Sequence, residues 1–132
     1  MNKRSYIISA KKSANIQIKE LAKVKRVFNH NFVKAVDLIL NCKGKVILAG
    51  IGKSGLIARK ISATFSSVGI PSFFCDPAQA LHGDMGQIEK RDILIILSYS
   101  GNTAELSNML KYANRYRIKI IGVASKPDSI LL

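Results

Sequence analysis

The sequence predicts one α/β domain in which a parallel sheet is covered by helices on both faces. Four short apolar segments alternate with helical patterns along the chain, and this alternation is typical of β-α-β units with right-handed crossovers. The chain has 132 residues, of which 48% are hydrophobic and only 3 are proline. It is therefore long enough for one hydrophobic core and too apolar to be disordered.

The segment from about residue 14 to residue 40 is predicted to be helical. Apolar side chains from Leu21 to Ile39 recur at steps of three and four residues, as they do on one face of a helix. The residues 29–31, Asn-His-Asn, predict a break into two helices, with Asn31 as the N-cap of the second. We expect residues 1–13 to form a flexible arm, so that the domain itself covers residues 14–132.

The sheet is predicted from residue 45 onward, because apolar runs of strand length begin there. A helical pattern follows the first run over residues 54–67, and another follows the third run over residues 103–116. The connection after the second run is shorter and covers residues 77–85. The four predicted strands are 45–49, 71–75, 92–97 and 118–124.

Charge and cysteine content narrow the class of protein. The chain carries 21 Lys and Arg against 8 Asp and Glu, an excess that nucleic acid could exploit. The N-terminal basic residues follow a helical pattern without interleaved aromatic residues, which favours a solvated helix face instead.

We see no signal peptide and no membrane-spanning run. Cys42 and Cys75 lack metal-type spacing, so we expect a cytoplasmic protein without disulfides, metal or cofactor.

A glycine-rich turn follows the first strand. Gly50, Gly52 and Gly55 form G-x-G-x-x-G between a strand and a helix, and Asp76 ends the next strand. This is the pattern of a dinucleotide-binding loop, in which the carboxylate reaches a ribose hydroxyl. A P-loop is excluded because Ile47 stands where its first glycine is required. A nucleotide-binding protein therefore stays open as the alternative function.

A hydroxyl-rich turn follows the third strand. Ser98, Ser100 and Thr103 lie around Gly101, just before the next predicted helix. Helix N-termini favour anions, and the hydroxyls add hydrogen-bond donors. Ser100 or Thr103 could simply cap the helix, but a cap needs one hydroxyl and this turn has three. We therefore predict a phosphate-binding loop.

The turn after the second strand carries further polar residues. Asp76, His82 and Asp84 follow that strand closely and could bind a metal ion, although one His with spaced carboxylates is a weak signal. His82 precedes Gly83 in a turn, so a role in a site and a purely structural role are equally favoured.

Four segments together resemble a sugar isomerase (SIS) domain, and the arabinose 5-phosphate isomerase branch in particular. They are G-I-G-K-S-G-L-I-A-R-K (50–60), P-S-F-F (71–74), A-L-H-G-D-M-G (80–86) and S-Y-S-G-N-T-A-E-L (98–106). The resemblance implies a three-layer fold of flavodoxin-like strand order that binds a sugar phosphate. In this branch ribulose 5-phosphate and arabinose 5-phosphate interconvert through an enediol. The implied catalytic residues are Lys53 and Glu105, and the implied substrate-binding residues are Ser54, His82, Ser98, Ser100 and Thr103.

The sequence departs from the family pattern at several points. Asp76 and Gln79 stand where the isomerase branch usually has His and Glu, and the roles of these two residues stay open. The family's fifth strand, the helices that follow it with a catalytic Glu and His, and its paired regulatory CBS domains have no counterpart here. We therefore expect a chain that is inactive alone, with its fourth strand as an unpaired apolar edge. With this edge unpaired, the chain is expected to be marginally stable or to pair with another chain, such as a complementing C-terminal fragment. The resemblance separately implies a homo-oligomer, because SIS relatives commonly form dimers or tetramers through their helices.

Overall fold

The computed structural model describes residues 3–80 and 82–132. By its internal contacts the chain divides into two compact units, Met1–Asp37 and Leu38–Leu132. Each unit is described by itself. Among the described residues, no helix is both long enough and apolar enough to cross a membrane.

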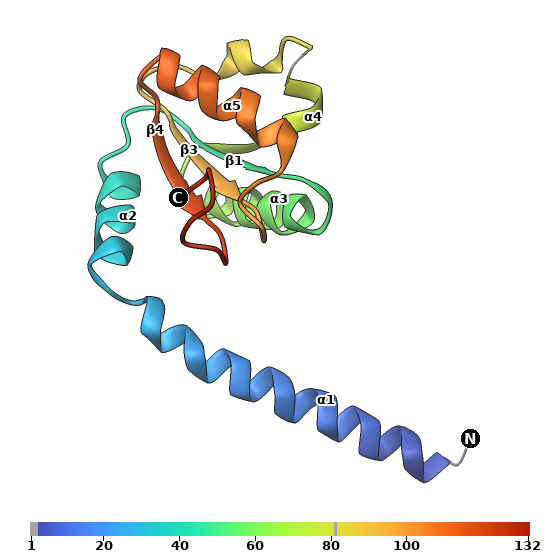
Figure 1. Ribbon diagram of the computed structural model, residues 1–132. Helices are drawn as coiled ribbons and strands as arrows, with labels where there is room; N and C mark the ends of the chain where they lie inside the picture. Colours follow the sequence, from blue (N-terminus) through green and yellow to red (C-terminus); the bar gives the residue numbers. More distant parts are fainter. Residues whose placement is uncertain (1–2, 81) are drawn as a thin grey trace. The chain divides into compact units, whose positions relative to one another are not determined.

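The described part of the N-terminal unit is helical (Figure 1), as predicted for the residues from 14 onward. Helix α1 covers Lys3–Lys23 and is followed by the 3₁₀ turn η1, Val24–Val27. The segment 3–13, expected as an arm, is part of α1, and its flexibility in solution stays a prediction. The break lies at the predicted place, but the cap was wrong: Asn29 Oδ1 accepts the backbone N–H groups of Asn31 (2.9 Å) and Phe32. Helix α2 therefore starts at His30 and runs over His30–Leu40.

The predicted parallel sheet is confirmed. Its strands are β1 (Val46–Gly50), β2 (Ser72–Cys75), β3 (Ile93–Leu97) and β4 (Lys119–Val123). All pairs are parallel, in the order β2-β1-β3-β4. Strands β1 and β3 are the interior strands and are nearly free of polar residues, as expected for strands buried on both faces.

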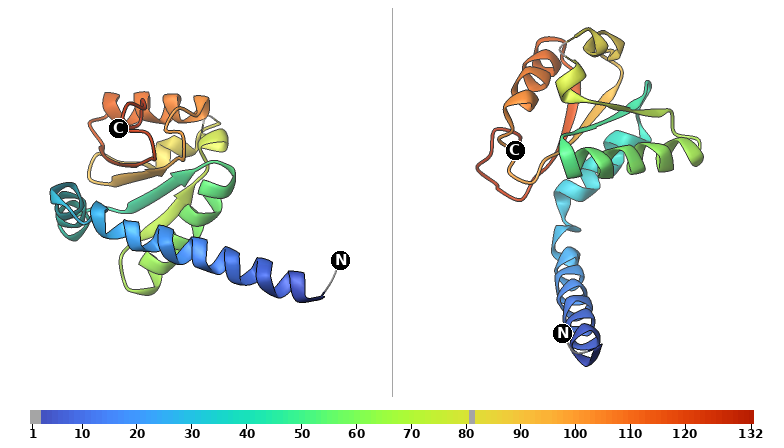
Figure 2. Two further views of the ribbon diagram at one scale, coloured as in Figure 1. Left: turned by 60° about the horizontal axis from the view of Figure 1, so that its bottom comes forward. Right: turned by 90° about the vertical axis from the view of Figure 1, so that its right-hand side faces the viewer.

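Helices cover both faces of the sheet, as Figure 2 shows. Helix α5 (Ala104–Arg115) packs on one face, where Ile47 and Leu94 point. Helix α3 (Gly52–Ser67) packs on the other, where Val46 and Leu48 point. The connection between β2 and β3 forms the short helix α4 (Pro77–Ala80) and the 3₁₀ turn η2 (Asp84–Gln87).

Strand β4 lies at the edge of the sheet, as predicted, but its surroundings were not predicted. The segment that follows it, residues 124–132, folds back so that Leu131 is only 8% exposed and joins the core on the α5 face. Gly122 allows this approach, because a Cβ there would lie 2.9 Å from the Leu131 carbonyl oxygen. The end of the chain therefore contributes to the core instead of trailing into solvent.

Candidate functional site

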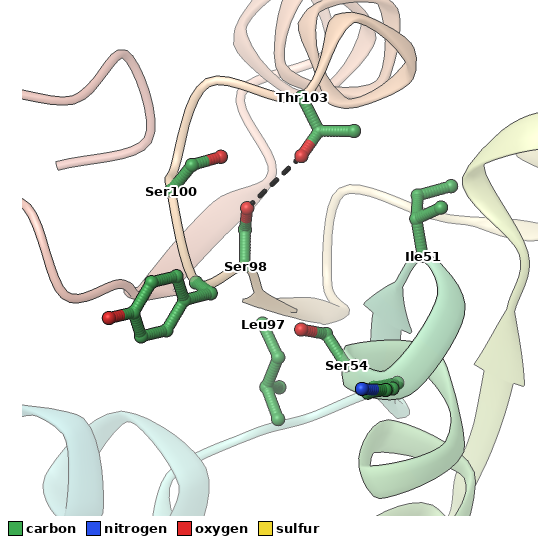
Figure 3. A pocket seen from close by; sticks show the side chains of 8 residues that line it. Ile51, Ser54, Leu97, Ser98, Ser100 and Thr103 are labelled. Atoms are coloured by element: carbon green, nitrogen blue, oxygen red, sulfur yellow. Dashed lines mark hydrogen bonds between the residues drawn. The ribbon is translucent and has the colours of Figure 1, made fainter.

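The carboxyl ends of β1 and β3 open onto one cavity of about 360 Å³. Figure 3 shows the side chains around it. Ligands of parallel α/β sheets bind at this edge. The cavity is lined by Ile51, Lys53, Ser54, Leu97, Ser98, Tyr99, Ser100 and Thr103.

The first wall comes from the glycine-rich turn between β1 and α3. A Cβ on Gly55 would lie 2.6 Å from the Gly50 carbonyl oxygen, and one on Gly50 would lie 2.9 Å from the carbonyl carbon of Ser54. Glycine at both positions therefore lets the end of β1 lie directly against the first turn of α3. This close approach places Lys53 and Ser54 on the cavity.

The second wall comes from the hydroxyl-rich turn between β3 and α5. The Gly101 N–H donates to Ser98 Oγ at 3.0 Å, and Ser98 Oγ lies 3.2 Å from Thr103 Oγ1. In Figure 3 the hydroxyls of Ser98, Ser100 and Thr103 converge on one space. Ser98 itself is buried, at 6% exposure, so it fixes the shape of the loop as well as offering an oxygen.

Thr103 decides between a simple helix cap and a binding loop. Its backbone occupies the N-cap position of α5, yet its side chain makes no capping hydrogen bond. A threonine serving only as a cap would accept a backbone N–H of the first turn. Here the hydroxyl faces Ser98 and the cavity instead.

The electrostatics of the cavity favour an anion. The N-termini of α3 and α5 both lie at this edge of the sheet, and each leaves backbone N–H groups without intrahelical partners. Lys53 adds a positive charge, and none of the lining residues is acidic. A phosphate group would meet two helix dipoles, several hydroxyls and an ammonium group at one place.

The back of the hydroxyl-rich turn is held by the chain beyond β4. The backbone carbonyl oxygen of Tyr99 accepts two hydrogen bonds from Ser125, one from its backbone N–H (3.1 Å) and one from its side-chain hydroxyl (2.6 Å). Asn102 Oδ1 accepts the Ile130 N–H at 2.9 Å. Sequence reasoning missed Asn102 and Ser125, because their partners lie more than twenty residues away along the chain and no local pattern marks them.

Two of the predicted site residues lie outside this cavity. Glu105 is half-buried in the first turn of α5. His82 is exposed in the turn after α4, where its backbone N–H donates to the Gln79 carbonyl at 2.9 Å. Neither lines the cavity that Lys53, Ser54, Ser98, Ser100 and Thr103 share. The catalytic and binding roles of all seven stay predictions.

Asp76 is engaged in local structure. Its Oδ1 accepts the Ala78 N–H at 3.0 Å at the start of α4, and its Oδ2 lies 3.8 Å from Arg59 Nη2. Arg59 in turn stacks 4.0 Å above the Phe74 ring. These contacts give Asp76 a role in the local structure at the start of α4, and the nucleotide alternative stays a prediction. In the part of the chain that is described, no three His, Cys, Asp or Glu side chains could share a metal ion.

Comparisons with known proteins agree with the geometry. The SIS-domain family model matches residues 39–132. The arabinose 5-phosphate isomerase GutQ of Escherichia coli K12 is 42% identical over 116 residues, which is 88% of this chain and 36% of GutQ. An uncharacterized protein of Rickettsia prowazekii is 42% identical over 131 residues, which is 99% of this chain and 41% of that protein.

A solved structure agrees as well. The E. coli CFT073 protein c3406 in complex with arabinose 5-phosphate has a TM-score of 0.91 and 35% identity, covering 99% of this chain and 70% of that one. The chain thus spans about two fifths of the length of the two curated relatives. It belongs to the SIS-domain family and resembles the arabinose 5-phosphate isomerases.

Proposed function

We propose that the chain binds a sugar phosphate at the carboxyl edge of its sheet, with the phosphate group between the two turns. The proposal rests on the position of the Thr103 hydroxyl, which does not cap α5 and instead faces Ser98 and the cavity. The arabinose 5-phosphate complex of a 35% identical relative supports the same ligand class. In this proposal Ser54, Ser98, Ser100 and Thr103 contact the phosphate oxygens.

A neighbouring hollow leaves room for the rest of the ligand. It measures about 290 Å³ and extends to Val123 at the end of β4 and to Ser125 beyond it. It shares the lining residues Ser54, Leu97, Ser98 and Tyr99 with the first cavity. A phosphate held by the hydroxyl-rich turn would leave its sugar free to lie along this hollow or beside Lys53.

Lys53 is the proposed catalytic residue nearest the phosphate cavity. Aldose–ketose exchange moves a proton between neighbouring carbons through an enediolate, and an ammonium group stabilises that developing negative charge. Glu105 is the proposed acid or base, a role that contributes roughly 10²–10⁴-fold in such reactions. The resemblance implies a further catalytic Glu and His that the matched residues of this chain do not include, so we expect the chain alone to bind a sugar phosphate without isomerising it.

Three further expectations belong to the same proposal. The further catalytic Glu and His that the resemblance implies would come from a second copy of the chain or from a complementing C-terminal fragment. The chain would act on small molecules and not on nucleic acid. A cytoplasmic location stays a prediction, consistent with the two free cysteines of the described chain.

The first test is a thermal melt of the purified chain with and without millimolar arabinose 5-phosphate. A ligand at about 100 times its dissociation constant adds roughly 2.7 kcal/mol to the free energy of unfolding. We expect the melting temperature to rise by several degrees. A cooperative melt that arabinose 5-phosphate leaves unchanged would contradict the proposal.

A matched pair of variants locates the binding. Ser100→Ala with Thr103→Ala removes two hydroxyls from the cavity and should abolish the ligand-induced shift. Thr64→Ala with Ser67→Ala removes two exposed hydroxyls from the far end of α3 and should leave the shift intact. Equal behaviour of the two double variants would show that binding lies elsewhere.

A further inference from the structure

We propose that the opposite, amino-terminal edge of the sheet carries a second anion site, which takes a small phosphate-bearing anion such as pyrophosphate. The site is a cavity of about 160 Å³ that is lined only by residues of the unit Leu38–Leu132. Its polar lining includes Lys43, Lys90, Arg91, Asp92 and Lys119. Neither the resemblance nor the sugar-phosphate proposal uses any of these residues.

The topology brings three lysines together from separate parts of the chain. Lys43 lies in the turn before β1, Lys90 lies in the turn before β3, and Lys119 is the first residue of β4. Lys119 is in register with Ile93, the first residue of β3. Because parallel strands begin at the same edge of a sheet, these three side chains surround one hollow.

The acidic residues of this edge are already engaged. Asp92 accepts the backbone N–H groups of Lys45 (2.7 Å) and Glu89 (2.8 Å), and its side chain is fully buried. Lys45 Nζ lies 3.4 Å from both Glu89 and Asp92, and Arg91 Nε lies 3.0 Å from Glu89. The positive charges of Lys45 and Arg91 are therefore compensated by the negative charges of Glu89 and Asp92.

The positive charges of the three cavity lysines are not compensated in this way. Lys43, Lys90 and Lys119 are exposed and make no ion pair with any residue of segments 3–80 and 82–132. Three like charges around one hollow repel one another, and a bound anion would relieve that repulsion. An anion with two or more negative charges is the ligand that gains most from the arrangement.

The size and the lining of the cavity narrow the ligand class. Leu38, Cys42 and Ile93 are its apolar lining residues, and no aromatic side chain lines the cavity. Single-stranded nucleic acids need aromatic platforms on which their bases stack, so a free anion fits better than an oligonucleotide. The volume is less than half that of the cavity at the carboxyl edge, about 160 Å³ against about 360 Å³, which suits one or two phosphate groups.

The test is isothermal titration calorimetry of the full chain with inorganic pyrophosphate at low salt. Lys43→Ala, Lys90→Ala and Lys119→Ala together should weaken binding at least about tenfold, since each charge contributes near the ligand. The control replaces Lys25, Lys60 and Lys111 by Ala, which removes the same charge from exposed positions elsewhere. The control should bind within about threefold of the parent chain.

A second variant separates this site from the sugar-phosphate cavity. The chain with Ser100→Ala and Thr103→Ala should still bind pyrophosphate, because both residues lie at the other edge of the sheet. Loss of binding in that variant would place the pyrophosphate in the carboxyl-edge cavity and overturn the proposal. Equal weakening by the two triple variants, or tighter binding of a single-stranded oligonucleotide than of pyrophosphate at the same salt, would overturn it as well.

Discussion

Gly101 shapes the proposed phosphate loop through its backbone conformation and its missing side chain. Its φ of 70° lies in the left-handed region, which costs other residues roughly 1–2 kcal/mol. A Cβ there would also lie 2.2 Å from Ser129 Oγ, a buried hydroxyl that has no hydrogen-bond partner among the described residues. The turn from Ser98 to Thr103 and the segment after β4 therefore meet at a glycine that no other residue can replace without strain.

Replacing Gly101 by Ala should therefore lower the free energy of unfolding by roughly 2–4 kcal/mol. It should also abolish the arabinose 5-phosphate shift, because the loop can no longer hold its shape. Urea unfolding and the ligand melt measure the two effects. Gly86→Ala is the matched control, since its φ is not positive and a Cβ there would contact nothing within 4 Å. Adding Ser129→Gly should recover part of the lost stability, and no recovery would mean that the contact with Ser129 is unimportant.

Cys75 is a second residue whose surroundings dictate its chemistry. Burial, and then the negative charges of Asp84 and Asp76, raise the pKa of its thiol to about 11. The thiolate is therefore rare at about pH 8, and alkylation of Cys75 in the folded chain should be at least about a hundredfold slower than after unfolding in urea. Mass spectrometry of iodoacetamide-treated Cys42→Ser protein measures this. Fast labelling of the folded variant would contradict the expected burial.

The raised pKa also predicts a pH dependence of stability. A group with a higher pKa in the folded than in the unfolded state stabilises the fold below the unfolded value, here near 9, and loses that contribution as pH rises toward about 11. Relative to a Cys75→Ala variant, the parent chain should therefore lose stability between about pH 9 and 11, by at most about 1.4 kcal/mol per pH unit. Parallel pH profiles of the two proteins would contradict this account.

At the scale of elements, local patterns explain which parts the sequence could predict. The strands could be predicted because short continuous apolar runs, such as the one in β3, are typical of strands in a sheet that is buried on both faces. The hydroxyl-rich turn was found because it follows such a strand directly. The cap of α2 was placed at Asn31 instead of Asn29 because both asparagines suit the position. The fold of residues 124–132 depends on contacts with distant residues, which local patterns do not encode.

The segment after β4 should be an integral part of the domain core. Leu131 is 8% exposed and packs in the cluster beneath α5, whereas its neighbour Leu132 is 58% exposed. Leu131→Ala should therefore lower the free energy of unfolding by roughly 2–4 kcal/mol, the usual cost of a buried cavity, and Leu132→Ala by less than about 1 kcal/mol. Denaturant unfolding curves measure both values. Similar values for the two variants would show that the segment is loosely attached.

At the scale of the whole molecule, the sheet has two unlike borders. At the β2 edge, Arg59 of α3 stacks on Phe74 and lies 3.8 Å from Asp76. The border at β4 has no further strand in the described chain, and Val123 at its end is 52% exposed. An apolar edge strand with free backbone groups is a template for pairing with another chain. Self-association of the domain is therefore expected to start at β4.

A single charge should test this. Lysine on an edge strand discourages pairing, because association would bring the charge against another strand. We expect multi-angle light scattering to show that the parent chain associates with rising concentration and that Val123→Lys shifts it toward the monomer. Val68→Lys adds the same charge at a 67% exposed position at the end of α3 and should change little. A parent chain that stays monomeric at high concentration and melts cooperatively would show that β4 is stable as an open edge, because the folded-back segment at Leu131 already supplies what a fifth strand would add to the core.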